Sequence, residues 1–277
     1  MSKKEKFIKI LAYVFLIAGV ISMIIPFLWM LLTSFMSDAQ IFSYPPKFIP
    51  EPFIVENYTN VASKMPVFKY FLNSLFVATI TTLGQILIAS FAGFAFAKLN
   101  FKFKEPLFFI ILLTMMIPPQ VNIVPLFYIM KELYWIDSFQ ALILPGLFGG
   151  FGIFLMRQWF KTLPDALIEA AKIDGCNYLH IYLKVALPTA LPAIATLAIF
   201  TFITCWNSFM WPLIVTNSES ITTLPVALAA FKGSFRETIE WGELMACSVI
   251  TTIPAILIFL IGQKYFIRGI MSAAVKE

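Results

Sequence analysis

Six long runs of apolar residues, nearly free of charge, constrain the fold of this 277-residue chain more than any other feature. A helix needs about 20 apolar residues to cross the hydrocarbon core of a bilayer, and each run reaches or approaches that length. Charged residues make up only 13% of the chain, against roughly 25% in a soluble domain. The sequence therefore predicts an all-α membrane protein, a single domain over residues 1–277 with six transmembrane helices. The predicted spans are 10–32, 71–97, 106–130, 139–156, 185–215 and 244–262.

The distribution of Lys and Arg predicts the orientation of these spans. When the six runs are threaded alternately, 14 of the 20 Lys and Arg residues fall on the side of the N-terminus and 6 on the other side. Cytoplasmic loops carry an excess of Lys and Arg, so both termini are predicted to be cytoplasmic. The long loops at 37–69 and 216–243 then lie outside. Loop 37–69 is rich in proline and aromatic residues, and we expect an ordered, extended segment there.

Helix-breaking residues interrupt the third and fourth runs. Pro118 and Pro119 lie in the third run, and Pro145 lies in the fourth among several glycines. Membrane helices tolerate such residues where neighbouring helices or water satisfy the freed backbone groups. We therefore expect kinks at these positions that face protein.

The cytoplasmic loop between the fourth and fifth spans, residues 161–184, contains a short amphipathic helix. Pro164 and Asp165 form a suitable helix start, because Pro is tolerated in the first turn and an acid complements the helix dipole. Gly175 is suited to end the helix in the left-handed conformation. Apolar residues give this helix an apolar face that must be buried somewhere. From the residues alone, the membrane surface and a groove of another protein are equally good candidates. The apolar residues of this face are Leu167, Ile168, Ala171 and Ile173.

This loop resembles the loop signature of the permease subunits of binding-protein-dependent ABC importers. Glu169-Ala170-Ala171 is followed after three residues by Gly175 and after nine more by Val185-Ala186-Leu187-Pro188. The family's pattern is EAA, three residues, G, nine residues, I-x-L-P, and Val185 is the one departure. Further segments are similar to the carbohydrate-importer branch, and the chain as a whole resembles the smaller permease of the maltose-transporter type. Among these segments are Leu142-Ile143-Leu144-Pro145, Phe154-Leu155-Met156-Arg157-Gln158 and Trp206-Asn207-Ser208-Phe209-Met210-Trp211-Pro212.

The resemblance implies a set of partners and a division of labour. A second, larger permease would complete the pore, a dimer of cytoplasmic ATPase subunits would bind ATP and Mg²⁺, and an extracytoplasmic binding protein would deliver the solute. The amphipathic helix would be a coupling helix that docks on one ATPase subunit, and the tail 264–277 would reach toward the same interface. Loop 216–243 would contact the binding protein. The residues assigned to coupling are Glu169, Ala170, Ala171, Asp174, Gly175, Leu187 and Pro188.

Polar residues inside the spans are candidates for lining the pathway of the solute. Polar groups within the membrane line pathways in some proteins and join helices by hydrogen bonds in more of them. The four candidates are Asn73, Gln120, Asn122 and Asn207.

The sequence disfavours other function classes. It contains no G-x-x-x-x-G-K-[ST] loop for ATP and no H-E-x-x-H motif, and with its single histidine, His180, no catalytic, cofactor or metal site is predicted. A secondary transporter usually carries ionisable residues at mid-membrane, and the middles of these spans have none. The expected function is therefore import of a sugar, a di- or oligosaccharide, across a bacterial or archaeal cytoplasmic membrane by a non-catalytic subunit. Glycerol phosphate or another polyol-like solute is the alternative.

Overall fold

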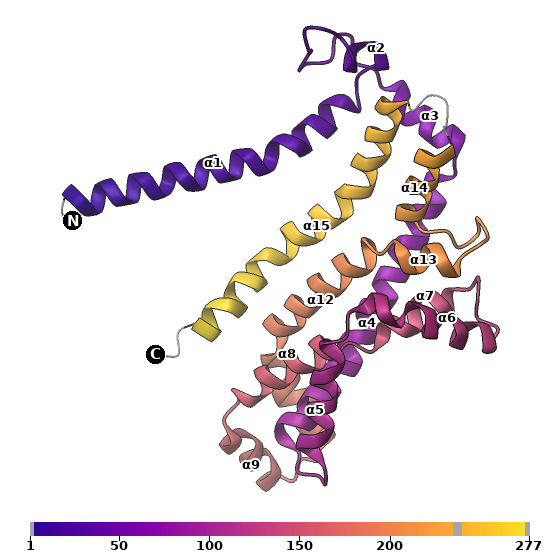
Figure 1. Ribbon diagram of the computed structural model, residues 1–277. Helices are drawn as coiled ribbons and strands as arrows, with labels where there is room; N and C mark the ends of the chain where they lie inside the picture. Colours follow the sequence, from indigo (N-terminus) through magenta and orange to yellow (C-terminus); the bar gives the residue numbers. More distant parts are fainter. Residues whose placement is uncertain (1–2, 235–239, 275–277) are drawn as a thin grey trace. The chain divides into compact units, whose positions relative to one another are not determined.

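The computed structural model describes residues 3–234 and 240–274, and all of the regular structure in these residues is helical (Figure 1). This confirms the predicted all-α class. In chain order the helices are α1 (Lys3–Thr33), α2 (Asp38–Ile41), α3 (Glu56–Lys64), α4 (Val67–Lys98), α5 (Lys104–Met115), η1 (Pro119–Asn122), α6 (Ile123–Glu132), α7 (Phe139–Ile143), η2 (Leu144–Leu147), α8 (Gly150–Lys161), α9 (Asp165–Ile173), α10 (Tyr178–Ile181), η3 (Tyr182–Ala186), α11 (Leu187–Thr189), α12 (Leu191–Trp206), α13 (Met210–Val215), α14 (Leu224–Ser234) and α15 (Trp241–Ala274).

Four segments are long and apolar enough to cross a membrane without a sharp bend, and two bent helix pairs bring the number to as many as six. These four segments are 4–33, 67–98, 139–161 and 241–263. The third consists of α7, η2 and α8, with a short break at 148–149. The predicted span 106–130 is not one helix, because α5 and the segment Pro119–Glu132 meet at 94°. The predicted span 185–215 is also broken, since Tyr178–Thr189 and Leu191–Trp206 meet at 76°.

The prolines explain the first of these breaks. Pro119 begins η1 and Pro118 precedes it in an extended conformation, so the ladder of helical hydrogen bonds stops after α5. The two prolines are exposed in the isolated chain. The sequence predicts that this kink faces protein, but no other part of the chain that the structure describes covers the two prolines.

The loop predicted at 37–69 is more helical than expected. Ser37 accepts a hydrogen bond from the backbone N–H of Gln40, whose side chain bonds back to the N–H of Ser37, and this capping box starts α2. The segment after it is irregular as far as α3. Loop 216–243 likewise contains a helix, α14, and its residues 235–239 lie outside the described part of the chain.

The chain divides into two compact units, residues 1–68 with 227–253 and residues 69–226 with 254–277. In the first unit, the side-chain amide of Asn57 donates to the carbonyl oxygens of Ser34 and Met36, 2.9 Å from each. The ammonium of Lys64 binds the carboxylates of Glu240 and Glu243, the latter at 2.6 Å. These contacts fix α3 to the chain after α1 and to the start of α15.

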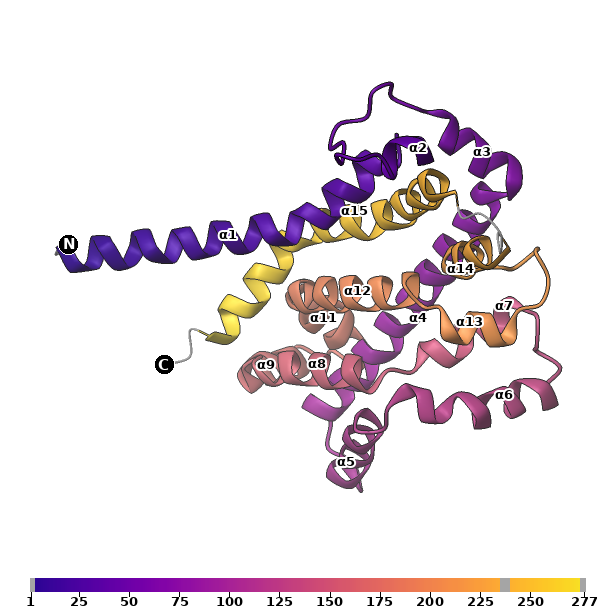
Figure 2. The same ribbon diagram turned by 45° about the horizontal axis from the view of Figure 1, so that its top comes forward.

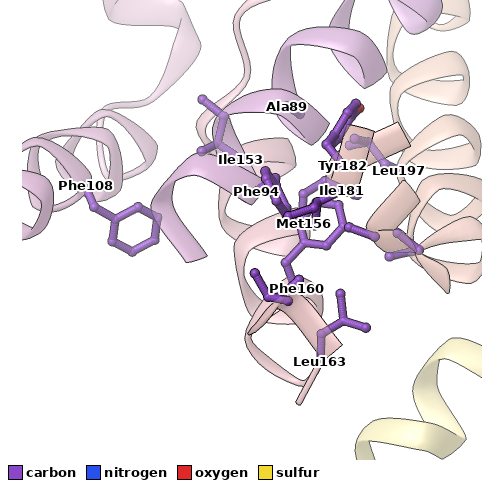
Figure 3. Packing of buried hydrophobic residues seen from close by; sticks show 14 residues of the cluster. Ala89, Phe94, Phe108, Ile153, Met156, Phe160, Leu163, Ile181, Tyr182 and Leu197 are labelled. Carbon is purple, nitrogen blue, oxygen red and sulfur yellow. The ribbon is translucent and has the colours of Figure 1, made fainter. Parts of the chain in front are cut away.

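The second unit is built on α4, α5, α8 and α12. Helix α8 packs against α5 and against α12, as Figures 1 and 2 show. Gly152 brings α8 close to α12, because a side chain there would meet Leu197 at 3.1 Å. The core of this unit includes Phe94, Met156, Phe160 and Tyr182, and the aromatic rings among them pack edge to face or tilted (Figure 3). This core supports the segment 161–184, which the sequence predicts to be cytoplasmic.

Candidate functional site

Helix α9 begins where it is predicted to begin. Pro164 is its N-cap residue and Asp165 lies in its first turn. The Asp165 carboxylate binds the ammonium of Lys98, the last residue of α4, at 2.6 Å. The same ammonium lies 2.6 Å from the carbonyl oxygen of Leu163. The hydrogen bond and charge of Lys98 hold the pKa of the Asp165 carboxyl below its ordinary value.

The apolar residues of α9 do not share one face. Ile168 is 4% exposed and packs in the core of the second unit, and Ala171 packs against the same core. Leu167 and Ile173 are exposed, Ile173 to 86%. The predicted single apolar face is therefore wrong: one side of α9 is buried by its own chain, and a separate side is left uncovered.

Of the four residues assigned to coupling that lie on α9 or at its C-cap, three are exposed. Glu169, Ala170 and Asp174 are exposed, with Lys172 between them. Ala171 is the exception, because it faces the chain's own core. This uncovered side presents a carboxylate at Glu169, a small residue at Ala170 and an exposed apolar side chain at Ile173.

Gly175 makes the turn after α9, as predicted. Its φ of +79° lies in the left-handed region that favours glycine. The N–H of Cys176 donates to the carbonyl of Ala171 at 2.9 Å, and the N–H of Gly175 donates to that of Lys172 at 3.0 Å. This pair of bonds is a Schellman motif, which satisfies carbonyls that the helix end leaves free.

The segment after this turn consists of α10 and the π-helix η3. Asn177 caps α10 by accepting a hydrogen bond from the N–H of His180 at 2.8 Å. In η3, the hydroxyl of Tyr182 shares a hydrogen bond of 2.7 Å with that of Ser90, and its ring stacks on Phe91 with centroids 4.4 Å apart. Of the last two residues assigned to coupling, Leu187 is half-buried against the core and Pro188 is exposed.

Arg157 supports this site, but the sequence predicts no contact for its side chain. Its side chain is 5% exposed, and its guanidinium lies 3.8 Å from the centre of the Phe108 ring. Its Nε donates to the carbonyl of Phe96 at 3.2 Å, and a terminal nitrogen binds Glu105 at 2.8 Å. Lys98 is missed in the same way. Both cations follow apolar runs, and only their burial reveals that they join helices.

The four candidate pathway residues do not share one environment. Asn73 is buried, and its amide donates to the carbonyls of Ser220 and Thr222 at 3.0 and 2.9 Å. These bonds give Asn73 a role in holding the loop at 220–222. Gln120 and Asn122 lie exposed in η1, at the break between α5 and α6, and Asn207 lies exposed just after α12.

A second polar cluster joins two segments that are both predicted to lie outside the membrane. Asp137 accepts hydrogen bonds from the N–H groups of Asn217 and Ser218 at 2.7 and 2.9 Å. Its own N–H donates to the carbonyl of Val215 at 2.8 Å. The bonds from Asn217 and Ser218 hold the pKa of the Asp137 carboxyl below its ordinary value. Within the described residues, His, Cys, Asp and Glu form no group of three that could hold a metal ion.

Comparison with known proteins identifies similar chains over almost the whole length. Residues 85–272 match the family described as binding-protein-dependent transport system inner membrane component. The sn-glycerol-3-phosphate transport system permease proteins UgpE of Yersinia enterocolitica and Escherichia coli are each 29% identical over 279 residues, which cover 99% of both chains.

Two solved structures of bacterial ABC transporters for alginate also contain similar chains. A chain of the first, a transporter involved in import of the acidic polysaccharide alginate, is 25% identical with a TM-score of 0.85 over 96% of this chain and 99% of that one. A chain of the second, a complex with an alginate pentasaccharide-bound periplasmic protein, is 15% identical with a TM-score of 0.65 over 94% of each, and it shares the fold. The segment matched by the family includes α9 together with α8 before it and α10 and η3 after it.

Proposed function

This chain belongs to the family of inner membrane components of binding-protein-dependent transport systems, and from that premise we propose that it forms half of the translocation pathway of an ATP-driven importer. Membership confirms the resemblance predicted from the loop pattern. The proposed complex contains a second, larger permease, a dimer of cytoplasmic ATPase subunits and an extracytoplasmic binding protein. In this complex ATP and Mg²⁺ are bound by the ATPase, and this chain is not catalytic.

The proposed topology has six spans with both termini in the cytoplasm. The two bent helix pairs then each count as one span. Two groups of contacts support this arrangement. Lys98 bonds to Asp165 and Arg157 bonds to Glu105, and all four residues are predicted to be cytoplasmic. Asp137 and Ser218, which lie in two different predicted outer loops, also bond to each other. The C-terminal tail from 264, proposed to reach toward the ATPase, includes residues 275–277 outside the described part of the chain.

The observation that carries the proposal is the uncovered side of α9. A short cytoplasmic helix held on its other side by Ile168 leaves a carboxylate at Glu169 and an apolar tip at Ile173 free to meet a partner. Closure of the ATPase dimer on ATP would push this helix and drive the spans between inward-facing and outward-facing states. Gly175 fixes the turn that presents the helix. The coupling residues proposed are Glu169, Ala170, Ala171, Asp174, Gly175, Leu187 and Pro188.

The proposed solute is a sugar, and glycerol phosphate or a polyol-like solute is the second candidate. The first has support from the structural likeness to an importer of the polysaccharide alginate. The second has support from the relatives that transport sn-glycerol-3-phosphate. Uptake assays with the cognate binding protein, using labelled oligosaccharide and labelled glycerol phosphate in competition, distinguish the two.

A labelling experiment tests the topology. In a background where Cys176, Cys205 and Cys247 are replaced by Ala, single cysteines are placed at Ile173 and at Tyr134, two of the most exposed positions of the second unit. A membrane-impermeant maleimide applied to intact cells should label Tyr134→Cys and leave Ile173→Cys unlabelled until the membrane is opened. Labelling of Ile173→Cys in intact cells would contradict the topology.

A cross-linking experiment tests the docking of α9. A photoactivatable maleimide attached to Ala170→Cys in the assembled importer should give an adduct with the ATPase subunit. The same reagent at Tyr134→Cys is the matched control and should give none. Absence of the adduct from Ala170→Cys in a complex that retains its ATPase would contradict the proposed docking.

A further inference from the structure

We propose that α4 is the lever that receives the displacement of α9, because both ends of the cytoplasmic segment 161–184 are bonded to the last turns of this one helix. The inference rests on the proposed function, and it adds the route by which a movement of α9 is transmitted to the helices of the second unit. In this route Lys98 and Tyr182 are positioning residues: they hold α9 on α4 and touch neither solute nor nucleotide.

The first attachment is the ammonium of Lys98. It bridges the Leu163 carbonyl and the Asp165 carboxylate, both at 2.6 Å, and its side chain is 5% exposed whereas that of Asp165 is 80% exposed. A cation at the C-terminus of α4 and an anion in the first turn of α9 each complement their helix dipoles. The start of α9 is thus held at the end of α4 by charge-assisted hydrogen bonds.

The second attachment is Tyr182, beyond the turn at Gly175. Its hydroxyl bonds to Ser90 and its ring stacks on Phe91, and both of these residues belong to α4. Ser90 and Lys98 are separated by eight residues, which is about 12 Å along a helix. Two attachments that far apart resist rotation of the segment about either one. A displacement of α9 then moves α4 instead of being absorbed by bending at Gly175.

The end of α4 is itself fixed to its neighbours. A side chain at Gly93 would lie 2.5 Å from the Met156 Cβ and 2.8 Å from the backbone nitrogen of Arg157, so α4 and α8 touch backbone to backbone there. Arg157 also binds the Phe96 carbonyl. The last two turns of α4 and the facing part of α8 therefore move as one body, and a push on α4 is passed to α8.

The experiment measures solute imported per ATP hydrolysed by the complete importer in proteoliposomes. Lys98→Met keeps the length of the side chain and removes its charge. The expected result is a fall of at least about tenfold in this ratio, the size of effect that loss of a charge-assisted hydrogen bond produces. Complex assembly and ATP hydrolysis should be retained. Lys98→Arg, which restores a cation, should recover most of the ratio. Lys102→Met is the control, since Lys102 lies on the nearby loop over Phe103 and should leave the ratio within about twofold of the parent.

A second pair of variants keeps the inference testable if Lys98→Met does not assemble. Asp165→Asn and Tyr182→Phe preserve shape, and together they weaken both attachments, so their combination should lower the ratio by about tenfold as well. An assembled Lys98→Met importer, or an assembled double variant, with the parent's ratio would overturn the inference. Glu169→Lys distinguishes a failure of the proposed role of α4 from a failure of the proposed function. If it uncouples transport while the attachment variants do not, only the role of α4 fails, and if it also has no effect, the proposed function fails.

Discussion

The guanidinium of Arg157 on α8 binds the carboxylate of Glu105 on α5, and one terminal nitrogen donates to both carboxylate oxygens at 2.8 and 3.0 Å. The two side chains differ in environment, because Arg157 is buried and Glu105 is 68% exposed. The pair therefore joins two helices at the cytoplasmic end predicted for them, with one member in the core and one at the surface.

This asymmetry predicts that the two members differ in their contribution to stability. Arg157→Ala removes the bond to the Phe96 carbonyl and the contact with the Phe108 ring, and we expect a loss of about 2–3 kcal/mol in the free energy of unfolding. Glu105→Gln removes only the charge of the exposed partner and keeps an acceptor oxygen for the Arg157 guanidinium, so it should cost less than about 1 kcal/mol. Thermal unfolding of the purified permease in detergent measures both. Equal losses from the two variants would show that the ion pair, and not the buried contacts, holds the helices.

The backbone contact at Gly93 predicts a large effect of a single methyl group. Gly93→Ala would place a Cβ against Met156 and the backbone of Arg157, and the packed helices would have to separate. We expect a loss of about 1–3 kcal/mol, as overpacking of a core produces. Gly19→Ala is the control, because nothing lies within 4 Å of a Cβ at Gly19 and alanine favours a helix. If unfolding temperatures fell equally for both variants, close packing of α4 on α8 would be excluded as the cause.

The hydrogen bonds of Asp137 predict that the stability of the two predicted outer loops that they join depends on pH. The bonds from Asn217 and Ser218 depress the pKa of its carboxyl, so they stabilise the fold fully above the ordinary pKa of about 3.9. That stabilisation is lost as the pH falls through the lowered pKa. Asp137→Asn retains an acceptor oxygen, tolerates the φ of +60° and should remove this pH dependence.

A second variant, Asp137→Ala, distinguishes the effect of the lost hydrogen-bond acceptor and backbone conformation from the effect of the lost charge. Asp137→Ala loses the acceptor and strains the left-handed backbone, at a total cost of about 2 kcal/mol. Unfolding temperatures between pH 7 and pH 3 test both variants. An Asp137→Asn protein with the parent's full pH dependence would show that another group titrates.

The turn at Gly175 predicts an effect that depends on backbone conformation. A Cβ at this position meets nothing within 4 Å, so space does not limit a substitution there, but the φ of +79° does. Gly175→Val should cost about 2 kcal/mol locally, and it should reduce uptake by disturbing the Schellman turn. Gly175→Asn tolerates the left-handed region and should keep most of the activity. Uptake that is equal in both variants would exclude a role for the turn geometry.

The sequence is sufficient to predict the all-α membrane fold and the bounds of α9, because span length, helix caps and a left-handed glycine are local properties. Pro164, Asp165 and Gly175 each act within a few residues of their own position. The bends between helices are harder to predict from the sequence. The sequence indicates kinks at Pro118 and Pro119, but not an angle of 94°, because that angle depends on what each half packs against.

The attachments of α9 are not predictable from the sequence for a related reason. Lys98 and Asp165 are 67 residues apart, and Ser90 and Tyr182 are 92 apart. A Lys at the end of an apolar run satisfies the positive-inside rule whether or not it meets a carboxylate. Similarly, Leu167 and Ile168 are both apolar in the sequence, and only the tertiary structure shows that Ile168 belongs to the core that includes Phe160 and Leu163.

The most direct test of the account is the number of solute molecules imported per ATP hydrolysed by the reconstituted importer carrying Glu169→Lys, with Glu169→Gln as the matched control. If α9 transmits force from the ATPase, reversal of the exposed charge should abolish import while the permease remains inserted and assembled, and the neutral variant should retain most of it. Import per ATP at the parent's level in an assembled Glu169→Lys importer would contradict the account.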